Sequence, residues 1–155
     1  HAGTGIALDV DGVTRVSTGI EFGTDTAAAN QLDDYEEGTY TPTYAVAGGG
    51  SVTSNGTVTN VGSYTKVGRL CTVGISSYIV QTSGTVTSYT VTLPFTGATT
   101  GAQAGGGFGQ ETGQTGMGVM IKVANGSTTA VINKYDGGSV PANSYFSLAF
   151  TYQTA

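Results

Sequence analysis

Residues 70–80 read LCTVGISSYIV, and their side chains alternate in character along the whole segment. One face is mostly apolar and consists of Cys71, Val73, Ile75, Ser77 and Ile79. Successive side chains of a strand point to opposite sides of a sheet, so this period of two predicts a half-buried antiparallel strand.

The same alternation recurs in three later segments. Their apolar faces are Tyr89, Val91, Leu93 and Phe95, then Met117, Val119, Ile121 and Val123, and finally Phe146, Leu148, Phe150 and Tyr152. Pro94 marks the point where ladder pairing of its segment should stop. Strands with one apolar face each imply two sheets packed face to face. We therefore predict an all-β fold, a two-sheet antiparallel β-sandwich of jelly-roll type over residues 39–155.

Turn residues fit this pattern. Asn55-Gly56 predicts a hairpin between residues 51–54 and 57–60, and Asn125-Gly126 predicts another between residues 117–124 and 128–135. Asp136-Gly137-Gly138 should end the last of these strands. Residues 96–116 are rich in glycine and predict a long loop, either mobile or functional.

Composition excludes several classes of protein. The 155 residues include 26 Gly and only 15 charged side chains, 10 acidic and 5 basic, so a helical bundle is disfavoured. A net charge of -5 with few Lys and Arg argues against nucleic acid as a partner. No apolar run is long enough for a membrane span, so we expect no membrane insertion. One Cys excludes an internal disulfide framework.

Residues 1–38 differ from the rest of the chain. Short apolar pieces are separated by glycines, and each is too short to bury a core by itself. An acidic stretch, residues 32–38, ends this region. We predict an extended arm with short strands that packs on something else. The chain opens on His1 without an initiator Met, which suggests a fragment of a longer polypeptide.

Residues suited to catalysis are scarce. The sole histidine is His1, so a Ser-His-Asp triad is not expected, and Cys71 lies on an apolar strand face. Glu111 and Asp136 could form a glycosidase pair, but a turn role for Asp136 and a solubilising role for Glu111 are preferred. Asp9-Val10-Asp11-Gly12 lacks the rest of a calcium loop. We predict a protein that is not an enzyme and has neither cofactor nor metal.

Two tyrosines remain unexplained by the core. Tyr78 and Tyr145 lie opposite the apolar faces of their strands, so we interpret them as exposed aromatics for a subunit contact or a ligand surface.

Four motifs occur in a characteristic order. Gly19-Ile20-Glu21-Phe22 is followed by LDDYEEGTYTP at residues 32–42, by SYTKVGRL at residues 63–70 and by Leu93-Pro94-Phe95. Over residues 19–95 this order resembles a family of bacteriophage virion proteins, chiefly the C-terminal regions of tail fibres and spikes. Residues 96–155 match only in character.

The resemblance implies the distal domain of a homotrimeric tail fibre, located in the virion and assembled in the host cytoplasm. Its partners would be other virion proteins through the N-terminal side, and a glycan or protein of the host-cell surface. Alternatives are an architectural capsid-decorating or collar fibre, and a glycan-cleaving tailspike. A threefold axis would let sister chains complete the arm.

The resemblance also suggests roles for single residues. The trimer junction would use Phe22, Leu32 and Tyr35. From the charge count alone, the acids Asp33, Asp34, Glu36 and Glu37 would need solvent, backbone N–H groups or Lys66 and Arg69 as partners. The candidate receptor loop consists of Gly105, Gly106, Gly107, Phe108 and Gln110.

Overall fold

The structure is a computed structural model that describes residues 11–16, 19–20, 32, 34–47, 50–54, 60–81, 86–101 and 104–155. The chain divides into two compact units, residues 1–33 and 34–155. In the first unit the described residues include one antiparallel bridge, in which Ile20 and Leu32 exchange two backbone hydrogen bonds of 2.9 Å. The predicted boundary after residue 38 falls inside the first strand of the second unit.

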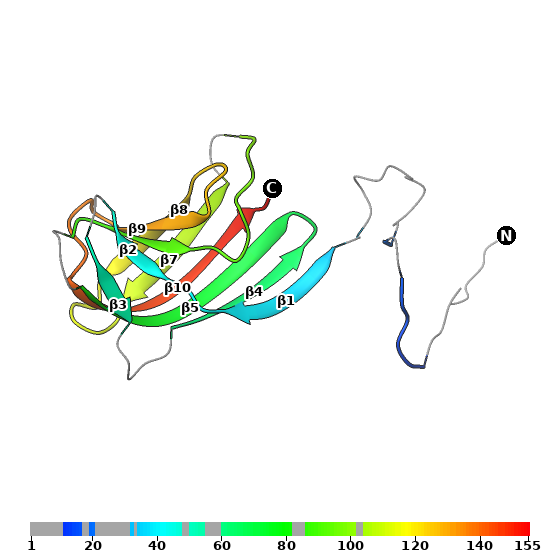
Figure 1. The fold of residues 1–155 in the computed structure, drawn as a ribbon, viewed down its shortest axis with the longest axis horizontal. Helices are drawn as coiled ribbons and strands as arrows, with labels where there is room; N and C mark the ends of the chain where they lie inside the picture. The colour runs from blue at the N-terminus through cyan, green and yellow to red at the C-terminus, as the bar shows by residue number, and fades with distance from the viewer. Residues whose placement is uncertain are drawn as a thin grey trace. The chain divides into compact units, whose positions relative to one another are not determined.

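The second unit is built from strands, and its described residues contain no helix. The strands are β1 (Tyr35–Tyr40), β2 (Tyr44–Val46), β3 (Val52–Ser54), β4 (Val61–Val67), β5 (Leu70–Gln81), β6 (Tyr89–Thr92), β7 (Gly105–Glu111), β8 (Gly118–Val123), β9 (Thr129–Lys134) and β10 (Asn143–Gln153). They form one antiparallel sheet in the order β1-β4-β5-β10-β7-β8-β9-β6-β2, with β3 paired to β5 (Figure 1).

The sheet is curled, so that β2 and β6 face β5 and β10 across the core. The ring of Tyr44 on β2 stacks on Phe146 of β10 at a centroid distance of 6.0 Å, and Tyr89 on β6 meets Phe146 edge-on at 5.8 Å. The Tyr44 hydroxyl also donates a hydrogen bond to Ser77 Oγ on β5, 2.9 Å away. The all-β prediction is confirmed, but the ladders run through one continuous sheet, and a separate second sheet is not confirmed.

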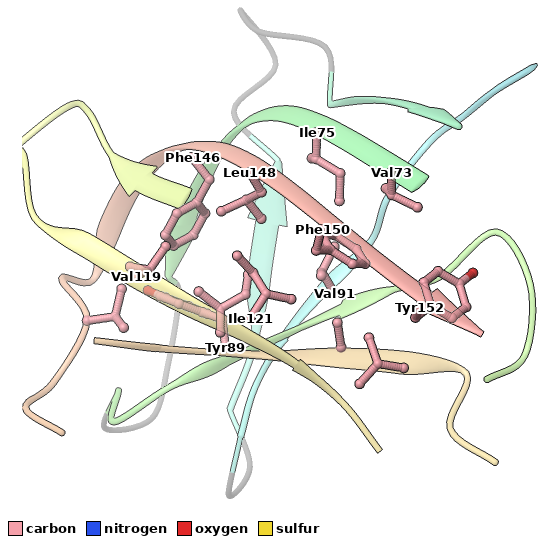
Figure 2. Packing of buried hydrophobic residues seen from close by; sticks show 14 of the residues in the cluster. Val73, Ile75, Tyr89, Val91, Val119, Ile121, Phe146, Leu148, Phe150 and Tyr152 are labelled. Atoms are coloured by element: carbon pink, nitrogen blue, oxygen red, sulfur yellow. The ribbon is translucent and has the colours of Figure 1, made fainter. Parts of the chain in front are cut away.

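The core fills the concave side of the sheet (Figure 2). The apolar faces predicted from alternation supply it, with Cys71, Val73, Ile75 and Ile79 from β5 and the four aromatic and aliphatic residues of β10 all buried. Tyr89, Val91, Val119, Ile121 and Val123 are buried opposite them, while Leu93, Phe95 and Met117 pack at the margin. The strands predicted from alternation are confirmed, but β6 ends at Thr92, so Leu93 and Phe95 lie beyond it.

The predicted turns have two outcomes. β8 and β9 form the expected hairpin, in which Val123 pairs with Ala130 and Gly126 takes the positive φ of 65° that a glycine tolerates. Gly137, with φ of 78°, follows β9 as predicted. The Asn55-Gly56 turn lies outside the described residues. The strand before it, β3, pairs with the end of β5, where Val52 is opposite Gln81.

Candidate binding surface

The side of the sheet opposite the core is here called the outer face, and it consists of the outward positions of the strands. Residues that lie opposite each other on successive strands form rows that cross the sheet. One row runs through Glu37, Thr65, Thr72, Thr151, Gly106 and Lys122. The next runs through Thr39, Ser63, Gly74, Ala149, Phe108 and Met120.

Charge is nearly absent from the outer face. Glu37 on β1 and Lys122 on β8 are the two charged residues at outward strand positions of the described chain, and both are exposed. Thr, Ser, Gly and Ala occupy most of the positions between them. Every large apolar side chain that is exposed within a strand of this unit also points outward: Tyr35, Val61, Val67, Leu70, Phe108, Met120 and Tyr145. An uncharged sheet face with exposed apolar side chains is suited to protein contacts.

The predicted receptor loop is in fact a strand. Gly105, Gly106, Gly107, Phe108 and Gln110 belong to β7, which is paired on both sides, so the prediction of a loop was wrong for these residues. The glycines are needed for close approach: a Cβ on Gly107 would lie 2.6 Å from Phe150 Cα and closer still to the carbonyl oxygen of Ala149. Phe108 projects outward and is 72 % exposed.

Glu111 ends β7 and is completely buried, so its predicted role as a solubilising charge was wrong. Its carboxylate accepts hydrogen bonds from the backbone N–H groups of Gly113 (2.8 Å), Gln114 (3.0 Å), Thr115 (2.9 Å) and Tyr145 (3.3 Å), and from the Thr115 hydroxyl (3.0 Å). Burial raises the pKa of Glu111, but the hydrogen bonds lower it further than burial raises it, and the net pKa lies below its usual value.

Residues 112–116, called here the 112–116 turn, are exposed, although the buried Glu111 binds their backbone. Beside the turn, Tyr145 pairs across the strands with Tyr78, and their rings stack at 3.8 Å with an interplanar angle of 7°. Gly113 lies against the Tyr145 ring, and Thr112 N donates to Tyr145 O over 2.8 Å. The structure therefore brings the two predicted tyrosines together, with Tyr145 40 % exposed.

The 112–116 turn lies at the end of the sheet remote from Asp34, where the chain enters this unit. β5 begins with Leu70, which is paired to Val67 and through it to Tyr35, next to the point where the chain enters this unit at Asp34. Tyr78 is eight residues further along β5, which corresponds to about 26 Å of extended strand.

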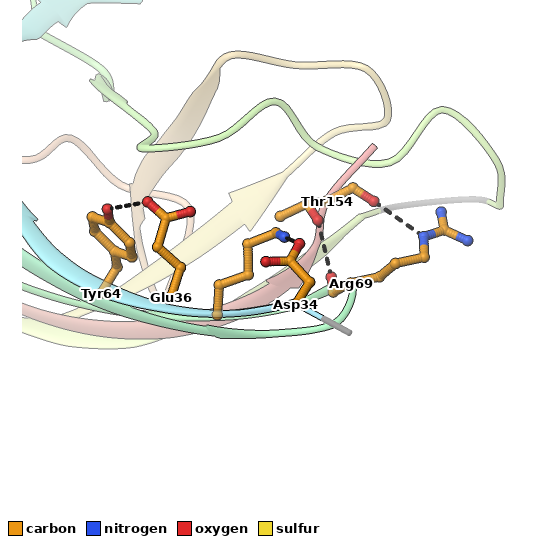
Figure 3. A network of polar contacts seen from close by, with 6 residues as sticks. Asp34, Glu36, Tyr64, Arg69 and Thr154 are labelled. Atoms are coloured by element: carbon orange, nitrogen blue, oxygen red, sulfur yellow. Dashed lines mark hydrogen bonds and ion pairs between the residues drawn. The ribbon is translucent and has the colours of Figure 1, made fainter. Parts of the chain in front are cut away.

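A polar network fixes the entry end (Figure 3). Lys66 forms an ion pair with Asp34, as predicted for one of the acids, and its ammonium lies 5.6 Å above the Phe95 ring. Glu36 accepts a 2.7 Å hydrogen bond from the Tyr64 hydroxyl, which raises the pKa of Tyr64. Arg69 forms no ion pair with the described acids Asp34, Glu36 and Glu37, and its Nε donates to Thr154 O at 3.3 Å. Asp33 lies outside the described residues, so its pairing with Arg69 stays a prediction.

The predicted junction residues lie in different parts of the chain. Phe22 is outside the described residues, and Leu32 belongs to the first unit, where it bridges Ile20. Tyr35 begins β1 and is 63 % exposed on the outer face, in one row with the exposed Val67 and Leu70.

The remaining reactive side chains have structural surroundings. Cys71 is buried, and burial raises the pKa of its thiol. Asp136 holds its turn through Gly138 N at 2.9 Å and pairs with Lys134 at 2.8 Å, which lowers its pKa. No group of three or more His, Cys, Asp or Glu that could hold a metal occurs within the described ranges. Likewise, no helix in the part of the chain that the structure describes could cross a membrane.

Comparison with protein-family models, curated proteins and solved structures found no match for this chain.

Proposed function

We propose that this chain is a non-catalytic structural protein of a bacteriophage particle. It forms the distal domain of a homotrimeric tail fibre, with the two halves of its curled sheet serving as the layers of a jelly-roll-like tip. The order of motifs over residues 19–95 supports the assignment to a virion, and the arrangement of the outer face supports a role in binding.

One observation carries the attachment role. The 112–116 turn is exposed, yet the buried carboxylate of Glu111 accepts hydrogen bonds from three of its backbone N–H groups, and from Tyr145 N of the adjacent β10. A turn fixed in this way loses little conformational entropy on binding. It adjoins the stacked pair of Tyr78 and Tyr145 and lies at the end of the sheet remote from Asp34, the entry point of the chain, where the proposed fibre tip would meet a cell. Three copies on one axis would add avidity.

The position of Glu111 does not support the alternative that the chain is a glycan-cleaving enzyme. Glu111 has no exposed surface, and its oxygens are occupied by the hydrogen bonds of the turn. A general acid or nucleophile must reach its substrate, so Glu111 is in the wrong place for glycoside cleavage.

The attachment role is tested with purified chain and host bacteria. Pre-incubating the bacteria with the chain should slow adsorption of the phage particles that carry it. Tyr145→Ala should weaken this competition at least about tenfold, as expected for an aromatic anchor. Tyr135→Ala is the matched control, because Tyr135 is likewise an exposed tyrosine, at 63 % against 40 % for Tyr145, but lies beyond β9. Equal competition by both variants would remove Tyr145 from the proposed site.

The position on the particle is tested separately. Gold-labelled antibodies against the purified chain should mark the distal ends of tail fibres in electron micrographs. Labelling at capsid vertices would favour the decorating fibre, and intact virions without label would contradict a virion protein altogether.

A further inference from the structure

The outer face has two flanks of different shape. On the β7–β8 flank, Phe108 and Met120 are cross-strand neighbours and project with exposed fractions of 72 % and 39 %. On the β4–β5 flank, the same row contains Ser63 and Gly74, and Gly74 has no side chain at all. One flank of the row therefore presents a projection, and the other presents a shallow region of small residues.

The flanks also differ in charge. Lys122 and Glu37 are the two ends of the neighbouring row. Lys122 lies next to Phe108 and Met120, and Glu37 lies next to Ser63. Neither takes part in a salt bridge between described residues, where the two pairs are Lys66 with Asp34 and Lys134 with Asp136. Between them the row contains only Thr65, Thr72, Thr151 and Gly106. A projection with a cation and a shallow region with an anion are complementary in shape and in sign.

Within one molecule the two flanks cannot meet, because β4 and β7 are separated by β5 and β10. Adjacent strands are about 4.8 Å apart, so Ser63 and Phe108 are roughly 14 Å apart along the row. The curl of the sheet also turns the two flanks in different directions (Figure 1). One copy can therefore contact two neighbours, one through each flank. A head-to-tail contact of this kind closes into a ring when the rotation fits.

We infer that the occupant of this surface is a second copy of the chain. In the homotrimer, Phe108, Met120 and Lys122 of each subunit pack on Gly74, Ser63 and Glu37 of the next, around a threefold axis. The inference rests on the trimer of the proposed function and locates its contacts. It assigns Phe108 to the subunit contact and leaves receptor binding to the 112–116 turn and Tyr145.

Disulfide trapping tests the contact directly. The variant Ser63→Cys with Phe108→Cys cannot close a disulfide within one chain, because a disulfide requires Cα atoms within about 7 Å of each other. The native Cys71 is buried and should not interfere. Mild oxidation of the full-length chain should give covalent trimers as the final product on a denaturing gel. Each single variant is the matched control and should give no trimers.

Charge exchange provides a second, non-covalent measurement. Lys122→Glu and Glu37→Lys should each increase the dissociation constant of the trimer at least about tenfold by analytical ultracentrifugation, and combining them should restore most of the affinity. Tyr135→Ala is the control at an exposed site outside the contact. Far-UV circular dichroism checks that each variant is folded.

The outcomes separate this inference from the proposed function. Covalent dimers as the final oxidation product would mean a twofold contact and would overturn the ring. A wild-type trimer that neither crosslinks nor responds to charge exchange would overturn the inference and leave the trimeric fibre in place. A wild-type chain that sediments as a monomer at all concentrations would contradict the trimer and the inference together.

Discussion

Glu111 is the residue whose chemistry the sequence predicts least well. As a residue of a glycine-rich segment it resembles a surface charge, yet it is buried and organises the 112–116 turn. Glu111→Gln keeps the size of the side chain but replaces one acceptor oxygen with an NH₂ group. This NH₂ group would face the backbone N–H groups of the turn, which are also donors. We expect the free energy of unfolding to fall by about 2–3 kcal/mol, measured by urea titration. Glu37→Gln, at an exposed position, should change it by less than about 0.5 kcal/mol.

The same carboxylate predicts a pH dependence. The pKa of Glu111 in the folded chain lies below its usual value, so the unfolded chain binds the proton more tightly than the folded chain does. The stability that Glu111 contributes is therefore complete above its unfolded pKa, about 4.3, and is lost as the pH falls through the lower folded pKa. Urea midpoints of the wild type and Glu111→Gln should converge as the pH is lowered below 4.3. A constant difference at all pH values would contradict an ionised carboxylate.

Strand β7 shows how glycine can build an element instead of interrupting it. A Cβ at Gly107 would meet backbone atoms of Ala149 and Phe150, which cannot move aside as a side-chain tip can. Gly107→Ala should lower the free energy of unfolding by about 1–3 kcal/mol or more, measured by urea titration. Gly118→Ala on the adjacent β8 is the matched control, since its Cβ would meet only Tyr135 Cδ1 at an ordinary 3.8 Å. Equal effects of the two substitutions would mean that β7 does not require glycine.

The strands that the sequence predicts well are those with alternating side chains. β5, β8 and β10 each bury one complete face, and period two identifies both the strand and its buried residues. In β7 the positions that face the core are mostly glycines, so no alternation remains, and glycine content alone indicates a loop. The one sign of this strand in the sequence is its end, where Phe108 and Gln110 alternate with Gly109 and Glu111.

The candidate site is less predictable than the core, because it depends on register. Tyr78 and Tyr145 could be recognised as outward residues from their own strands, but their stacking depends on which residue of β10 lies opposite Tyr78. The shared rows of Glu37 with Lys122 and of Gly74 with Phe108 involve six strands that are not in chain order. Such rows exist only after the chain has folded.

At the scale of the whole molecule, the unit of residues 34–155 has a core on one side of the sheet and an outer face on the other. The chain enters at Asp34 at one end of the sheet, and the other end presents the 112–116 turn. The outer face between these ends is the part that remains without a partner in a single chain. The proposed subunit contacts and the proposed receptor contacts should therefore respond independently to substitution, because they involve different parts of the sheet.

In the proposed trimer, the subunit contacts could lie in residues 1–33 or on the outer face, and truncation distinguishes these two locations. Every residue of the described hydrophobic core lies between Val46 and Tyr152, so a chain that starts at Asp34 retains the whole core. Its free energy of unfolding per subunit should stay within about 1 kcal/mol of that of the full-length chain. Because the proposed subunit contacts also lie after residue 34, the truncated chain should sediment as a trimer. A folded but monomeric truncated chain, beside a trimeric full-length chain, would place the contacts in residues 1–33 and remove them from the outer face.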